Sequence, residues 1–108
     1  MSGNDLNKLL PLTESTYYIM LALIEPLHGY AVMQKIETLS EGAISVGPGT
    51  LYGAFSTLEG QGLIVKVQEE ERRKSYALTS KGKQVLARQI ERLEIMVRGG
   101  LAVREQLS

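Results

Sequence analysis

Residues 47–60 read GPGTLYGAFSTLEG and have the pattern of a helix with two different faces. Pro48 has the fixed φ angle that suits the first position of a helix. Leu51, Phe55 and Leu58 recur at helical spacing and therefore share one side, together with Ala54. The pattern predicts a helix over about Pro48–Gly60. The opposite side carries small or hydroxyl-bearing residues, which suit either an ordinary solvated helix face or a close approach to the phosphates and base edges of a nucleic acid. These residues are Thr50, Tyr52, Gly53, Ser56 and Thr57.

Two helices are predicted before this segment. The first runs from the N-cap Thr13 to about Glu25, and the second runs from residue 29 or 30 to Ser40. The centre of the first helix, residues 17–24, has no polar face, and a helix that is apolar all round must be buried all round. One small domain does not provide that much cover. We therefore expect a second subunit against this helix.

A hairpin of two short strands is predicted after residue 62. Leu63, Val65 and Val67 alternate along the chain as in a half-buried strand. Tyr76 and Leu78 alternate in the same way after a polar, charged turn. Because alternate side chains of a strand point to the same face, we expect the apolar side of this hairpin to face the helices.

The last predicted element is a long helix that Thr79 or Ser80 caps. Its apolar residues are spaced as in a coiled coil, which predicts a dimerisation seam. The predicted dimerisation residues are Leu86, Ile90, Leu93 and Val97, with Tyr17 and Leu21 of the first helix. Lys81 and Lys83 open the last helix, where positive charge is unfavourable to the helix dipole. A compensating benefit such as proximity to phosphate is expected.

Composition argues against several classes of protein. The 108 residues suffice for one domain. The longest apolar run is far shorter than the roughly 20 residues that cross a bilayer, and the N-terminus lacks the pattern of an export signal, so we expect a cytoplasmic protein without a membrane span.

The chain has no cysteine and one histidine, so the usual constellations for catalysis are missing. We expect no enzyme, no cofactor and no metal site, and we expect His28 in a loop or at a helix start.

The net charge of zero conceals an uneven distribution of charge. Residues 1–47 contain five acidic and two basic residues, whereas residues 72–92 contain seven basic residues and one acidic residue. Such a basic region suits phosphate neutralisation. Arg72, Arg73 and Lys74 of the hairpin are predicted to contact DNA, although charges there also keep an exposed hairpin soluble. Residues 69–71 are three glutamates, which would be repelled from a DNA backbone.

The predicted order of helix, helix, helix, strand, strand, helix is that of the winged helix-turn-helix, an α+β, mainly α, fold. In this fold the third helix enters the DNA major groove beside a β-hairpin wing. Three segments narrow the assignment: LHGY at residues 27–30, the PGTLY to GLI stretch within 48–64, and RKSYALT with Gly82 at 73–82. Together they resemble the PadR family of bacterial transcriptional regulators over about residues 13–90. The single C-terminal helix resembles the small subfamily. Gly47 departs from the serine that the family often has before the proline, and it lacks the hydroxyl with which that serine could contact phosphate.

The resemblance implies a homodimer that binds a palindromic operator in double-stranded DNA as a repressor. Residues 1–78 would then form the DNA-binding region and residues 79–108 the dimerisation helix of one continuous domain. It also implies a small hydrophobic, phenolic or drug-like effector between the subunits. The residues expected to line its crevice are Tyr17, Tyr18, Met20, Leu21, Leu93, Met96 and Val97. The alternative function is a winged-helix module that binds protein and not DNA, which the near-neutral charge allows.

Overall fold

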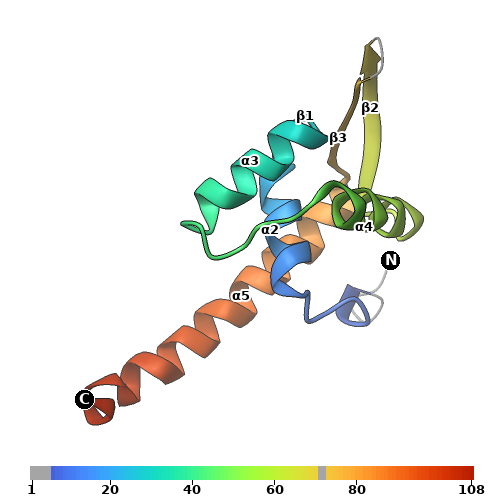
Figure 1. Cartoon of the computed structure of the whole chain (residues 1–108). Helices are drawn as coiled ribbons and strands as arrows, with labels where there is room; N and C mark the ends of the chain where they lie inside the picture. The colour runs from blue at the N-terminus through green and yellow to red at the C-terminus, as the bar shows by residue number, and fades with distance from the viewer. Residues whose placement is uncertain (1–5, 71–72) are drawn as a thin grey trace.

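The computed structural model describes residues 6–70 and 73–108, and its elements follow the predicted order with one short strand added (Figure 1). The helices are α2 (Glu14–Ala22), α3 (Gly29–Leu39), α4 (Pro48–Gly60) and α5 (Ser80–Val103), which ends in a short 3-10 turn, η1 (Arg104–Leu107). The strands are β1 (Leu27–His28), β2 (Ile64–Glu70) and β3 (Arg73–Leu78). The fold is therefore a mainly helical winged helix with a small antiparallel sheet.

The helix boundaries follow from local capping. The Thr13 hydroxyl accepts a hydrogen bond from Thr16 N at 3.1 Å and caps α2, as predicted. α2 stops at Ala22, earlier than predicted, because Leu23 already leaves helical geometry before Pro26. The bounds of α4 agree with the prediction, and Gly47 caps it without a side-chain hydrogen bond.

The sheet has the strand order β1-β3-β2, and all of its pairs are antiparallel. The sequence did not reveal β1, because a strand of two residues is too short to show an alternating pattern. β1 pairs Leu27 with Tyr76 and His28 with Ser75 on β3. This pairing ties the start of α3 to the base of the wing.

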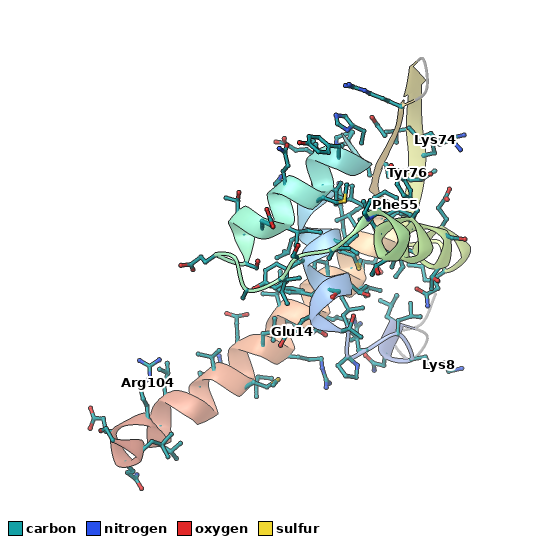
Figure 2. All side chains as sticks on the ribbon, in the orientation of Figure 1. Lys8, Glu14, Phe55, Lys74, Tyr76 and Arg104 are labelled. Carbon is teal, nitrogen blue, oxygen red and sulfur yellow. The ribbon has the colours of Figure 1, made fainter. Side chains whose placement is uncertain are left out.

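The core lies where α2, α3, α4, the sheet and the first turns of α5 meet. Phe55 of α4 and Tyr76 of β3 are both buried, and their ring centroids lie 4.6 Å apart (Figure 2). The first strand predicted from the sequence corresponds to β2, and its predicted inward face is wrong in part. Val65 is 46% exposed and Val67 is 49% exposed. Leu63 is buried before the strand starts, Ile64 takes the inward position, and β2 then extends away from the helices (Figure 1).

α5 gives the molecule its elongated shape of 55 × 36 × 20 Å. Its first turns pack on the body, and the rest extends alone, away from the tip of the wing (Figure 1). Gly99 and Gly100 do not interrupt the helix. Within the described ranges, no helix is both long and apolar enough to span a bilayer.

Candidate nucleic-acid interface

The outer face of α4 is open to solvent along its whole length. Leu51, Phe55 and Leu58 are buried and fix the orientation of the helix. The predicted contact residues Thr50, Tyr52, Gly53, Ser56 and Thr57 are all exposed. Apart from its chain neighbours and the backbone of its own helix, no described atom lies within 4 Å of the place where a β-carbon on Gly53 would stand. Thr57 Oγ1 donates back to Gly53 O at 3.2 Å, which turns this hydroxyl toward the helix.

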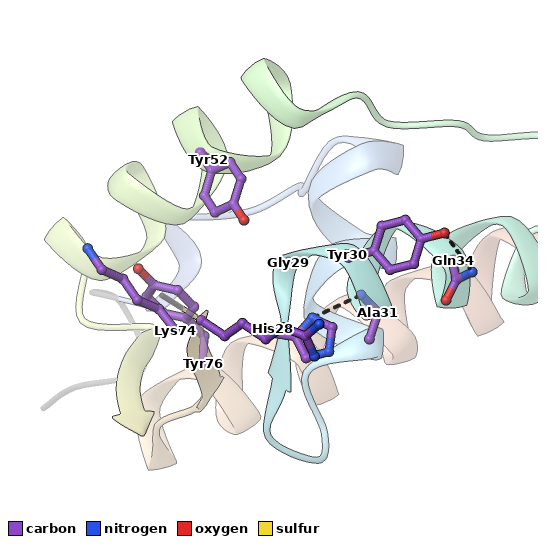
Figure 3. Close-up of a pocket in the computed structure, with 9 residues that line it drawn as sticks. His28, Gly29, Tyr30, Ala31, Gln34, Tyr52, Lys74 and Tyr76 are labelled. Carbon is purple, nitrogen blue, oxygen red and sulfur yellow. Dashed lines mark hydrogen bonds between the residues drawn. The ribbon is translucent and has the colours of Figure 1, made fainter. Parts of the chain in front are cut away.

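A hollow of about 660 Å³ lies between α4, the start of α3 and β3 of the wing (Figure 3). It joins the outer face of α4 to the basic part of the hairpin. The residues that line it are His28, Gly29, Tyr30, Ala31, Gln34, Tyr52, Arg73, Lys74 and Tyr76. The sequence-predicted residues Tyr52, Arg73 and Lys74 therefore meet at one place. They come from two elements that are about 20 positions apart in the chain.

Aromatic packing holds the Tyr52 side chain at the rim of this hollow. The ring of Tyr52 stands edge-on to Phe55, with centroids 5.7 Å apart, and Phe55 in turn packs on Tyr76. The hydroxyl end of Tyr52 lies against Gly29, where a β-carbon would overlap it. Tyr52 is nevertheless 51% exposed. A partly packed ring with an accessible hydroxyl suits a hydrogen bond to a phosphate.

The start of α3 adds residues that were not predicted for this surface. His28 is the N-cap of α3, where its Nδ1 accepts from Ala31 N at 3.5 Å, so the expected helix-start role is confirmed. The exposed Tyr30 hydroxyl accepts from Gln34 Nε2 at 3.4 Å. The positive end of the α3 dipole also points into this region, and such an end favours anions. In the sequence, only the resemblance of LHGY at residues 27–30 to a family pattern pointed to this segment.

Within the described part of the wing, β3 carries two basic side chains. Arg73 and Lys74 are exposed, and their backbones pair with Glu70 and Glu69 of β2. Arg72, the third predicted wing contact, and Glu71 lie outside the described residues. The wing and the end of α5 form opposite extremes of the molecule, with Lys74 near one and Arg104 near the other (Figure 2).

A second surface combines α5 with one side of α2. Of the predicted dimerisation residues, Ile90 and Val97 are exposed, while Tyr17, Leu21 and Leu93 are half-buried. Leu86 is buried in the core of its own chain, so it supports the fold and is not free to meet a partner. A groove of about 420 Å³ runs between Tyr17 and the Ile90, Leu93 and Val97 side of α5.

The predicted effector crevice needs one correction. Met20 is fully buried among the core residues of its own chain and does not face a crevice between subunits. Tyr18 is half-buried and packs edge-on to Tyr17, with centroids 5.6 Å apart. A second groove of about 220 Å³ runs along the other side of Leu93 and includes Tyr17 and Met96. Burial raises the pKa of the Tyr17 hydroxyl, and Tyr18 raises it further, so Tyr17 is a neutral phenol near pH 7.

Comparison with known proteins agrees with this architecture. The crystal structure of a PadR family regulator from Eggerthella lenta superposes with a TM-score of 0.69 at 26% identity, covering 84% of this chain and 81% of that one. The transcriptional regulator YqjI of Escherichia coli is 36% identical over 69 residues, which are 64% of this chain and 33% of that protein. A protein in a Streptomyces fradiae transposon is 41% identical over 64 residues, 59% of this chain and 18% of that protein.

The chain thus spans about a third or less of these two relatives. Residues 19–88 match the model of the PadR-like family of transcriptional regulators. Together with the shared fold, this match shows that the chain belongs to the PadR-like family of transcriptional regulators.

Proposed function

We propose that this regulator is a homodimeric repressor that reads a palindromic duplex operator with α4 and the β2–β3 wing. Residues 1–78 would supply the DNA contacts, and residues 79–108 would hold the two copies together. The observation that carries the proposal is the hollow between α4, α3 and β3. It brings the hydroxyl of Tyr52 and the cations of Arg73 and Lys74 to one exposed surface.

The outer face of α4 fits entry into a major groove. Phosphate contacts position a protein on DNA, and contacts to base edges give specificity. The Tyr52, Arg73 and Lys74 side chains at the hollow are suited to phosphate, because they combine a hydroxyl donor with two cations. Thr50 and Ser56 are short hydroxyl residues on the same helix and are suited to base edges. Gly53 allows the helix backbone to approach the duplex closely.

The extended half of α5 supports the homodimer. Ile90, Leu93, Met96 and Val97 lie along a helix that its own chain leaves largely uncovered. A helix with such a broad apolar face is stabilised by packing against another helix. Two copies joined in this way place two α4 helices on symmetric half-sites, which a palindromic operator matches.

A small apolar effector would bind beside Tyr17 in the grooves along Leu93. These grooves lie next to the proposed dimer contact, so an occupant there would change how the two copies pack. The neutral Tyr17 phenol offers a hydrogen bond at the edge of an apolar site. Titration with a panel of phenolic and flat aromatic compounds, followed by calorimetry, tests this part. Absence of binding in wild-type protein would remove the effector from the proposal and leave the DNA contacts unaffected.

DNA binding itself is tested by fluorescence anisotropy with a labelled duplex over a range of salt concentrations. We expect the logarithm of the affinity to fall linearly with the logarithm of salt concentration, because phosphate contacts release counterions. Tyr52→Ala and Arg73→Ala should each weaken binding. An absence of salt-dependent binding would favour the alternative, a winged-helix module that binds protein.

A further inference from the structure

The end of α4 and the start of α5 are joined by hydrogen bonds that bypass the wing. Gln61, Gly62 and Leu63 present consecutive carbonyl oxygens after the last turn of α4. Lys81 Nζ donates to Gln61 O at 2.9 Å, and Thr79 Oγ1 donates to Gly62 O at 2.6 Å. The backbone N of Thr79 donates to Leu63 O at 3.0 Å. The two side-chain bonds connect residues that are 20 and 17 positions apart.

The two helix ends are also in close contact. Gly82, in the first turn of α5, is buried against Leu63, and a β-carbon at position 82 would overlap the Leu63 carbonyl. The Thr79 hydroxyl accepts from Gly82 N at 3.0 Å, so one side chain caps α5 and bonds to the end of α4. The charge of Lys81 lies at the negative end of the α4 dipole. This interaction compensates for its unfavourable position at the start of α5.

We propose that this junction, made by Thr79, Lys81 and Gly82 against residues 61–63, fixes the angle between α4 and α5 and thereby sets the half-site spacing that the dimer accepts. The inference rests on the proposed dimer and its DNA binding. The covalent path between the two helices runs through the wing, which extends away from the body (Figure 1). The junction connects the end of the proposed DNA-reading helix directly to the first turn of the proposed dimerisation helix.

The physical basis is the effective concentration of the second half-site. Once one α4 is bound, the second gains affinity only if its position matches the other half-site. A rigid angle between α4 and α5 restricts the dimer to one half-site spacing, whereas a loose angle tolerates several spacings. Thr79 and Lys81 are therefore positioning residues for DNA recognition.

A distance measurement tests the junction without DNA. The chain has no cysteine, so Ser56→Cys places one spin label on the exposed face of α4 in each copy. Pulsed electron paramagnetic resonance then gives the distribution of distances between the two α4 helices. We expect Lys81→Met and Thr79→Val to widen a narrow wild-type distribution. Thr79→Ser, which keeps the hydroxyl, and Lys83→Met, which removes an exposed charge two residues farther along α5, should leave it unchanged.

Binding to operators of altered spacing gives the functional readout. With one base pair inserted between the half-sites, wild-type affinity should fall about 100-fold, because simultaneous engagement is lost. In Lys81→Met and Thr79→Val this ratio should fall to about tenfold or less, while affinity for a single half-site changes less than about twofold. Sedimentation and circular dichroism check that every variant is a folded dimer.

The possible outcomes separate the two proposals. Unchanged distance distributions and spacing ratios in both variants would overturn the role of the junction. A single half-site affinity that falls as far as the affinity for the whole operator would also overturn it, because Thr79 and Lys81 would then act by contacting DNA or by general destabilisation. If wild-type protein bound no duplex, the proposed function would fail, and the distance measurement would still decide the junction.

Discussion

The hydroxyl end of Tyr52 on α4 lies against Gly29 at the first position of α3, so closely that a β-carbon at position 29 would overlap it. The contact links the proposed DNA-reading helix to the preceding helix of the fold. It also fixes the direction of a side chain that is 51% exposed and that we propose contacts phosphate. The position of Tyr52 therefore depends on the absence of a side chain at residue 29.

Gly29→Ala should displace the Tyr52 ring and weaken DNA binding roughly tenfold, the effect of losing one hydrogen bond to a charged group. Fluorescence anisotropy with the operator measures the change. A double-mutant cycle supplies the control, because alanine at position 29 should have no further effect once Tyr52→Ala has removed the ring. Equal losses from Gly29→Ala in both backgrounds would contradict the proposed coupling.

Arg73→Ala should weaken DNA binding at every sequence and lower the slope of log affinity against log salt by about 1, because one phosphate contact is lost. Arg104→Ala removes the same charge from the exposed turn η1, far from the wing, and serves as the control. The salt series for both variants is measured on the same duplex. An unchanged slope for Arg73→Ala would show that this side chain only keeps the wing soluble.

Gly53→Ala should stabilise the protein and weaken its binding to DNA. Glycine within a helix is destabilising by roughly 0.5–1 kcal/mol relative to alanine, and no described atom packs close to this position. Packing within the described residues therefore does not require a glycine at position 53, whereas close approach to a duplex would require one. Gly99→Ala on α5 should raise the melting temperature without changing DNA affinity. Unchanged or tighter operator binding by Gly53→Ala would contradict this account of α4.

Leu93→Glu should convert the dimer to a monomer, because it places a charge in the proposed apolar seam of α5. Ile95→Glu is the matched control, since Ile95 is 61% exposed and helical periodicity turns it to the opposite side of α5. Sedimentation velocity at several concentrations compares the two variants. If both remained dimers, the contact between copies would lie elsewhere.

The elements that the sequence predicted well are those with a strong local signal. Apolar spacing and Pro48 predicted the bounds of α4, Thr13 was identified as the cap of α2, and Thr79 caps α5 as one of the two caps predicted, Thr79 or Ser80. The LHGY, PGTLY and RKSYALT segments led to the family that the comparisons show. Membership in a family of transcriptional regulators agrees with the prediction that the chain is not an enzyme.

The errors come from tertiary placement, which local patterns do not encode. Val65 and Val67 have a strand pattern, but β2 extends beyond the helices that would cover them. Met20 was predicted to line the effector crevice and Leu86 to lie in the dimerisation seam, yet each is buried in its own chain. The interaction of Lys81 with Gln61 O joins positions on either side of the wing, so no sequence pattern predicts it.

Selection of binding sites from a pool of random duplexes, followed by sequencing, tests the proposed function most directly. The account predicts enrichment of one palindrome whose half-site centres lie about 10 base pairs, or a multiple of that, apart. Enrichment should disappear for the monomeric Leu93→Glu variant and persist for Ile95→Glu. Recovery of a single asymmetric site, or no enrichment by wild-type protein, would contradict a dimer that reads DNA with paired α4 helices.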